Sequence, residues 1–334
     1  MSEILVREMR GNVVENVHRG HIVVVDEKGQ VLRATGDPAH ITYLRSSGKP
    51  IQALPAVMSG IARKFGLTDR ELSLLAASHR GESFHIEALD SMKQKLGLTD
   101  EHLLCSPTYP LNPATRDELL KKGQTTRRMY HNCSGKHLGM MALCKSKGYP
   151  LEGYYEPEHP VQQEILHVMS VMTGCKPEEI GRGVDGCGVP VFAMPLRNLA
   201  HAFLKLGCPE LIEDIEMRKA ADQITRAMNA YPEMISGTDA ICTQLLMDAN
   251  IVAKGGAQGV YCFGLRQERL GFALKIMDGS SDEWPLIIAS ILEQIGYQNQ
   301  ATIDRLYQIA NQEIVNDNKR IVGRNEACFT LASR

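Results

Sequence analysis

Apolar residues near the start of the chain fall into short runs separated by polar positions, a pattern typical of β-strands. Such runs occur at 13–14 and 22–25, and a Lys-Gly pair at 28–29 marks a turn after the second run. From residue 4 to about residue 37, this pattern predicts two or three antiparallel strands.

The middle of the chain repeats its apolar residues three and four positions apart, which is the period of a helix. The segment 51–61 predicts a buried helix, and Thr68 and Glu71 form a capping box in front of another. Ser83 is predicted to cap the helix after that, which has its apolar face over residues 86–96. Further helices are expected at 118–122, 138–144, 161–172, 196–206, 211–228 and 238–247.

After residue 250 the pattern returns to strands, at 251–254, 259–263 and 271–276, followed by a helix at 285–295. Strands at both ends with helices between them predict an α+β fold, in which both termini build one antiparallel sheet flanked by helices. We expect a single catalytic domain over residues 1–334. Its α/β half covers about 1–45 plus 180–334, and its central helical half covers about 46–179.

Composition narrows the class of protein. A hydrophobic content of 43% over 334 residues is enough for a large core, and a net charge of −2 argues against nucleic acid as a partner. The chain has no apolar stretch of membrane-spanning length, and its first residues lack the pattern of a signal peptide. Nine cysteines without a framework spacing fit reduced thiols, so a cytoplasmic protein is expected.

The segment 45–50, Arg-Ser-Ser-Gly-Lys-Pro, carries the first candidate chemistry because it opens the helix at 51–61. Residues three apart on a helix share a face, so Lys49 is expected beside Ser46 as a base beside a nucleophile. The alternative is an ordinary helix cap followed by a surface lysine, and spacing alone favours that alternative.

Two other segments contain candidate pocket residues. Lys254 is followed by Gly255, Gly256 and Ala257, and paired glycines let a backbone approach a ligand and offer an amide to an oxyanion. Ser78 ends a helix among small residues that suit a tight pocket. For the first segment, the alternative is a loose hairpin with a surface lysine. For Ser78, it is a serine that bonds its own backbone.

The segment 181–186 matches the glycine spacing of dinucleotide-binding loops. The residues that follow, Cys-Gly-Val-Pro at 187–190, cannot open the helix that such a loop requires. The segment is therefore predicted to be a turn.

Metal-ligand candidates fall into two groups. The spacing of His79, Glu82 and His85 matches no zinc motif, so we interpret these residues as cap and surface positions. Cys133 and Cys187 both lie next to glycine-bearing turns, and two thiolates from separate loops suit zinc. The alternative is a pair of inert buried cysteines.

Five segments taken together resemble the thermolabile, rhizobial-type L-asparaginase family, in the order of that family and over nearly the whole chain. They are Arg45-Ser46-Ser47-Gly48-Lys49-Pro50, Ala77-Ser78-His79-Arg80-Gly81-Glu82, His131-Asn132-Cys133-Ser134-Gly135-Lys136-His137, Asp185-Gly186-Cys187-Gly188-Val189-Pro190 and Lys254-Gly255-Gly256-Ala257. The resemblance implies a fold like that of serine β-lactamases and serine-dependent glutaminases. It also implies hydrolysis of L-asparagine to L-aspartate and ammonia, by a homodimer.

The resemblance assigns roles to individual residues. Two serine-lysine pairs carry over, Ser46 with Lys49 and Ser78 with Lys254. A zinc site carries over to Cys133, Lys136 and Cys187, with Asp185 nearby. Substrate contacts are expected from Arg45, Asn132, Asp185, Gly255, Gly256 and Ala257.

Two other functional classes are compatible with these residues. One is a zinc-dependent amidohydrolase in which metal-bound water attacks the amide, and the other is a catalytically silent ligand sensor on a penicillin-recognising fold. Asparagine and glutamine differ by one methylene, which allows only about 1–3 kcal/mol of discrimination. The substrate preference therefore depends on the resemblance.

Overall fold

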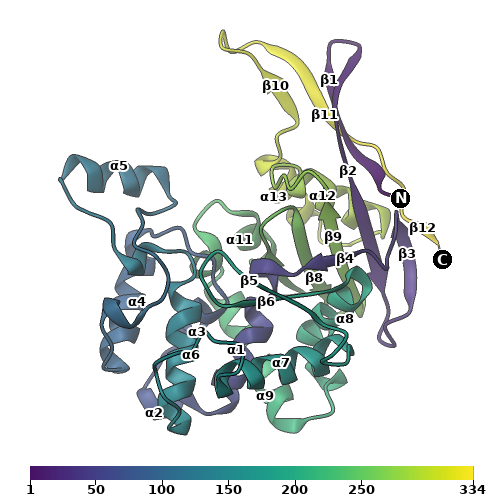
Figure 1. Cartoon of the computed structure of the whole chain (residues 1–334). Helices are drawn as coiled ribbons and strands as arrows, with labels where there is room; N and C mark the ends of the chain where they lie inside the picture. The colour runs from purple at the N-terminus through teal and green to yellow at the C-terminus, as the bar shows by residue number, and fades with distance from the viewer. Residues whose placement is uncertain (334) are drawn as a thin grey trace.

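One antiparallel sheet built from both ends of the chain forms one side of the molecule, beside the helical region (Figure 1). The computed structural model describes residues 1–333. Along the sheet the strands follow the order β10-β11-β1-β2-β9-β8-β7, and β3 pairs with both β2 and β12. This arrangement confirms the predicted α+β fold. The strands are β1 (Glu3–Arg10), β2 (Val13–Val25), β3 (Val31–Thr35), β7 (Ile251–Gly255), β8 (Val260–Leu265), β9 (Leu270–Ile276), β10 (Glu313–Val315), β11 (Ile321–Ala327) and β12 (Ala332–Ser333).

A second, three-stranded sheet has the order β4 (Ile41–Tyr43), β6 (Pro190–Pro195) and β5 (Gly181–Val184). The predicted turn at 181–186 is therefore wrong for its first four residues, which pair with β6. The turn comes later, where the Gly188 N–H donates to the Asp185 carbonyl over 2.9 Å. Short strands such as β5 are formed by pairing with a partner, and their own sequence shows no apolar alternation.

Helices fill the middle of the chain, as predicted. The capping box of Thr68 and Glu71 is present. The N-cap of α4 is Glu82, so the prediction of Ser83 was one residue late. The strands β10 to β12 and the helix α13 were not predicted. The helices are α1 (Lys49–Met58), α2 (Ile61–Phe65), α3 (Asp69–Ser73), α4 (Ser83–Lys95), α5 (Pro113–Lys121), α6 (Ser134–Lys147), α7 (Pro160–Thr173), α8 (Leu196–Gly207), α9 (Ile215–Ala230), α10 (Glu233–Ser236), α11 (Ile241–Leu246), α12 (Trp284–Gln294) and α13 (Gln300–Ile309).

The helix α1 lies at the centre of the helical region and packs against α6, α7 and α9. Nine of its ten residues are buried, Lys49 among them. No helix within residues 1–333 has both the length and the apolar content needed to cross a membrane.

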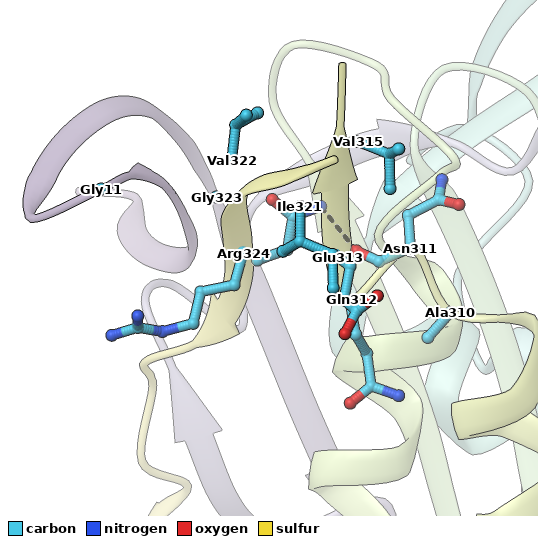
Figure 2. A pocket seen from close by; sticks show the side chains of 11 residues that line it. Gly11, Ala310, Asn311, Gln312, Glu313, Val315, Ile321, Val322, Gly323 and Arg324 are labelled. Carbon is cyan, nitrogen blue, oxygen red and sulfur yellow. Dashed lines mark hydrogen bonds between the residues drawn. The ribbon is translucent and has the colours of Figure 1, made fainter. Parts of the chain in front are cut away.

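The hairpins β1–β2 and β10–β11 project together from the rest of the molecule as an arm (Figure 1). A cavity of about 870 Å³ lies against this arm. Figure 2 shows Glu313, Arg324 and Asn311 among its lining residues, with backbone and aliphatic side chains around them. The predicted site residues lie at a different and smaller cavity, so cavity size does not locate the chemistry here.

Candidate active site

The turn that carries Ser46 is a short 3₁₀ helix, Arg45–Gly48, which runs directly into α1. Arg45 has a φ of +48°, in the left-handed region that residues other than glycine rarely adopt. Its Nε donates to Asp185 Oδ1 over 2.9 Å. Such backbone strain persists only where surrounding contacts hold it, and it is concentrated at functional sites.

The end of β7 approaches this turn closely. A Cβ on Gly256 would lie 2.8 Å from the Leu44 carbonyl oxygen and 3.3 Å from the Ser47 nitrogen, so only glycine fits there. The close contact at Gly256 is with the backbone of this turn, whereas Gly255 packs against the side chains of Trp284 and Tyr261. The contact at Gly256 brings Ala257 and Ser46 to the same cavity wall.

The hydroxyl of Ser78 joins two buried lysines. Ser78 lies in an extended segment after a 3₁₀ turn, where its N–H donates to the Ile235 carbonyl. Its Oγ accepts a hydrogen bond from Lys49 Nζ over 3.0 Å and another from Lys254 Nζ over 3.0 Å. The alternative in which Ser78 bonds only its own backbone does not hold.

Each lysine is held by carbonyl oxygens as well. Lys49 Nζ donates to the carbonyls of Ala77, at 2.7 Å, and Asn132, at 3.1 Å. Lys254 Nζ donates to its neighbour Gly255 O over 2.7 Å. Neither lysine is on the surface, since Lys49 is 0% and Lys254 1% exposed.

Ser46 is placed differently from the expectation. The described residues provide no hydrogen bond between Ser46 Oγ and Lys49 Nζ, because the lysine side chain reaches inward to Ser78. Ser46 lines the same cavity as Ser78 and Lys254. The two serines therefore share one cavity, with Lys49 bonded to the second of them.

Burial changes the acid-base properties of both amines, because a charged group loses its hydration there. It lowers the pKa of Lys254 to about 8, and the nearby charge of Lys49 acts in the same direction. Burial also lowers the pKa of Lys49, although the Cys133 thiolate opposes this shift. Both lysines are thus easier to deprotonate than surface lysines.

The cavity at these residues has a volume of about 380 Å³. That volume falls within the range of small-molecule sites. The cavity brings together seven of the predicted site residues: Ser46, Ser78, Asn132, Lys254, Gly255, Gly256 and Ala257. Arg45 and Asp185 form an ion pair with each other and are not among the lining residues.

A buried cluster of thiols and an amine lies on the other side of Lys49. Lys136 Nζ donates to Cys187 Sγ over 3.1 Å and lies 3.7 Å from Asp185 Oδ2. A hydrogen bond from Cys187 lowers the pKa of the Cys133 thiol well below its usual value, and the charges of Lys49 and Lys136 add to this. Burial alone would lower the pKa of Lys136, but the two sulfurs raise it.

This cluster provides the donor set that zinc prefers. Two sulfurs and one nitrogen from separate segments converge, with a carboxylate nearby, and sulfur donors select zinc over harder cations. The pKa of the Cys133 thiol is lowered, which favours the thiolate, the form in which cysteine ligates a metal. Cys133, Lys136 and Cys187 therefore fit the predicted zinc site.

The histidines of the segment 77–82 and its surroundings do not form a metal site. His79 Nε2 bonds Ser134 Oγ, His85 Nε2 bonds the Glu233 carbonyl, and Glu82 bonds Thr238. Glu82 is a cap residue as predicted. The interpretation of His79 and His85 as surface residues was wrong, since both are fully buried.

Several residues of the cavity wall were not predicted. Arg80, Asp239 and Asp282 supply charge, and Trp284 supplies an aromatic face. Arg80 lies in one of the five segments singled out from the sequence, so that signal was present. Asp239, Asp282 and Trp284 stand in segments without a recognisable motif, and only the fold brings them here.

Comparisons with known proteins agree with the resemblance. Three solved structures are similar at low identity. A β-lactamase from Mycobacterium bovis is 15% identical, with a TM-score of 0.39 over 82% of this chain and 94% of that one. A Bacillus glutaminase is 14% identical, with a TM-score of 0.38 over 83% and 90%. A β-lactamase-like protein from Bacteroides dorei is 13% identical, with a TM-score of 0.42 over 82% and 92%.

No curated protein matches the chain. The sequence profile of the L-asparaginase II family, in contrast, matches residues 6–327. That match covers every segment that lines the cavity, from Ser46 to Asn311. The chain therefore belongs to the L-asparaginase II family and is an amidohydrolase.

Proposed function

We propose that the protein hydrolyses L-asparagine to L-aspartate and ammonia through a covalent serine intermediate. The observation that carries this proposal is the Ser78 hydroxyl, bonded to the amines of Lys49 and Lys254 in a cavity that also presents Ser46. Two buried amines of lowered pKa beside two hydroxyls form an arrangement suited to proton transfer and nucleophilic attack.

Ser46 is the proposed nucleophile. It lines the cavity, its hydroxyl has no hydrogen bond within residues 1–333, and it lies in the 3₁₀ turn that runs into the N-terminus of α1, where the helix dipole favours a developing negative charge. Catalytic hydrogen bonds often tighten only when substrate binds, so the missing Ser46–Lys49 bond is compatible with Lys49 as the base.

The reaction then has two balanced steps. The Ser46 oxygen forms an ester with the side-chain carbonyl carbon of asparagine, the carbon-nitrogen bond breaks, and the nitrogen leaves as ammonia with the proton taken from Ser46. Ser78 relays that proton between Lys49 and Lys254. Water next attacks the ester and releases aspartate. The backbone N–H groups of Ser46 and Ala257, which have no acceptor within residues 1–333, are proposed to bind the oxyanion.

The cavity wall also supports an amino-acid substrate. Arg80 supplies a positive charge, and Asp239 and Asp282 supply negative charges. A zwitterion with an α-carboxylate and an α-ammonium group needs both signs. These residues are therefore proposed to hold the backbone of asparagine.

An ammonia-release assay on the purified full-length chain tests the proposal, with asparagine, glutamine and a β-lactam as separate substrates. We expect continuous ammonia release from asparagine that exceeds release from glutamine. Faster release from glutamine would correct the substrate, and no release from either amide would favour the ligand sensor.

Zinc is proposed to bind Cys133, Lys136 and Cys187 and to order the cavity from behind Lys49. Bound zinc would supply a rigid, positively charged link between these segments. Binding requires an unprotonated Lys136, so affinity should fall as the pH falls. Three donors that include two thiolates leave a metal that is a weak Lewis acid, while the serines and lysines already provide a nucleophile and bases.

Removal of zinc is expected to raise the KM for asparagine more than it lowers kcat. The measurement strips the protein with a chelator, verifies the loss of zinc by elemental analysis and determines both constants. A Cys187→Ser variant should reproduce the effect without a chelator. If the folded, metal-free protein loses its turnover at saturating asparagine, the zinc-dependent mechanism with metal-bound water is correct instead.

A further inference from the structure

A cluster at the base of the arm contains one imidazole and three carboxylates, of which His18 and Glu283 are buried. His18 Nδ1 lies 2.6 Å from Asp278 Oδ2, and His18 Nε2 lies 2.8 Å from Glu8 Oε1 and 3.4 Å from Glu283 Oε1. These residues come from β1, β2, the turn after β9 and the start of α12. None of them belongs to the thiol cluster or lines the 380 Å³ cavity.

The local backbone accounts for this convergence. Glu8 pairs with Asn16 across the β1–β2 ladder, so Glu8 and His18 are diagonal neighbours on one face of the sheet. The turn at Asp278 is fixed by a hydrogen bond from the Ser280 N–H to Asp278 Oδ1. Glu283 stands at the N-cap of α12, where its side chain can turn back to His18.

His18 is the partner in every ion pair that the three carboxylates of the cluster form within residues 1–333. Within residues 1–333, no lysine or arginine forms an ion pair with Glu8, Asp278 or Glu283. The Glu283 side chain is only 7% exposed, and its Oε2 is buried without a hydrogen-bond partner. A buried carboxylate in that condition is costly unless a cation binds it.

We propose that Glu8, His18 and Glu283 bind a divalent transition-metal ion such as Mn²⁺. The three donor atoms lie within 4.8 Å of one another. Atoms that are each about 2.1 Å from one ion lie roughly 3 to 3.5 Å apart, close to the separations found at His18 Nε2. One imidazole with two carboxylates suits Mn²⁺ or Zn²⁺ and disfavours Ca²⁺, which takes oxygen ligands alone.

Asp278 completes the site as a positioning residue. When an ion is bound, its contact with His18 Nδ1 would keep the proton on that nitrogen and leave the Nε2 lone pair for the ion between the two glutamates. A lone pair and two carboxylates that face one another require a positive charge between them. A proton on Nε2 supplies one positive charge against three carboxylates, whereas a divalent ion supplies two.

The site would connect the arm to the wall of the 380 Å³ cavity. Glu283 lies between Asp282 and Trp284, and both of these neighbours line that cavity. Trp284 is the single tryptophan of the chain, so its fluorescence reports on the segment that carries the metal ligand.

The test is a Mn²⁺ titration of the full-length chain after treatment with a chelator. Free Mn²⁺ is measured by electron paramagnetic resonance, and Trp284 emission is recorded in parallel. Mn²⁺ is the probe because the thiols of Cys133 and Cys187 prefer softer ions. We expect one bound Mn²⁺ per chain and a saturable change in emission with the same midpoint.

Three variants locate the ion. His18→Gln and Glu283→Gln should weaken Mn²⁺ binding at least tenfold, and Asp278→Asn about tenfold through loss of the positioning contact. Glu15→Gln is the matched control. Glu15 lies on β2, as His18 does, but it is exposed and pairs with Arg10. This variant should bind Mn²⁺ as the unchanged chain does.

Two results would overturn the proposal. One is the absence of bound Mn²⁺ in the unchanged chain, which would make the cluster an ion-paired imidazolium only. The other is equal binding by the unchanged chain and Glu283→Gln, which would place the ion elsewhere. If Glu283→Gln fails to fold by circular dichroism, Glu8→Gln replaces it, because Glu8 is 26% exposed and its loss disturbs the core less.

Discussion

The Ser46→Ala protein is expected to lose at least about 1,000-fold in kcat for asparagine while it keeps its fold. Removal of a nucleophile eliminates the covalent route and leaves only the contributions of binding and oxyanion stabilisation. The fold should persist because the Ser46 hydroxyl has no hydrogen bond within residues 1–333 and the residue lines the cavity. Steady-state ammonia release measures kcat, and circular dichroism measures the fold.

Ser78→Ala is the comparison variant, because Ser78 lies in the same cavity and bonds both lysines. It should lower kcat but still form the ester at Ser46. Rapid acid quenching followed by mass spectrometry of the peptides identifies the serine that carries the aspartyl group. Near-normal turnover in Ser46→Ala, or an aspartyl group on Ser78, would make Ser78 the nucleophile.

The amino-acid sequence was sufficient to predict the elements with a strong apolar period. The runs in β2 and in β7 to β9 are buried on the sheet, so their apolar residues mark them. The hairpin β10–β11 was not predicted, because it lacks such burial. Both of its faces are partly exposed, and it therefore shows no apolar alternation.

The candidate site was also predicted in part. Spacing within 45–50 placed Ser46 and Lys49 on one turn, but it could not show which hydroxyl Lys49 bonds. That partner, Ser78, is 29 residues away, and Lys254 is 176 residues from Ser78. Contacts over such separations arise only from packing of α1 and β7 against the segment after the 3₁₀ turn at Leu74–Ala76.

The cluster of His18 is an extreme case, since His18 and Asp278 are 260 residues apart. Neither residue stands in a segment that the sequence singled out. The thiol cluster was found because each of its cysteines lies in such a segment. The tertiary structure is thus needed most to find clusters whose residues stand outside any recognisable sequence motif.

The rate of asparagine hydrolysis is expected to rise with pH through the pKa of Lys254, and this dependence should disappear in Lys254→Met. Lys254 has a pKa of about 8, because burial disfavours its charged form. Only the neutral amine can accept a proton from Ser78. The active fraction therefore increases from pH 6 towards pH 9, and kcat/KM should follow it with a midpoint near pH 8.

Methionine keeps the length and the apolar character of the lysine side chain but cannot accept a proton. Lys254→Met should therefore lower kcat/KM about 100-fold or more at pH 8 and leave a profile without the rise near pH 8. Lys205→Met is the matched control. Burial also lowers the pKa of Lys205, but this residue of α8 bonds the Val171 carbonyl of α7 and does not line the cavity. An unchanged profile in Lys254→Met would remove Lys254 from the proton path and leave Lys49 as the only amine that acts on Ser78.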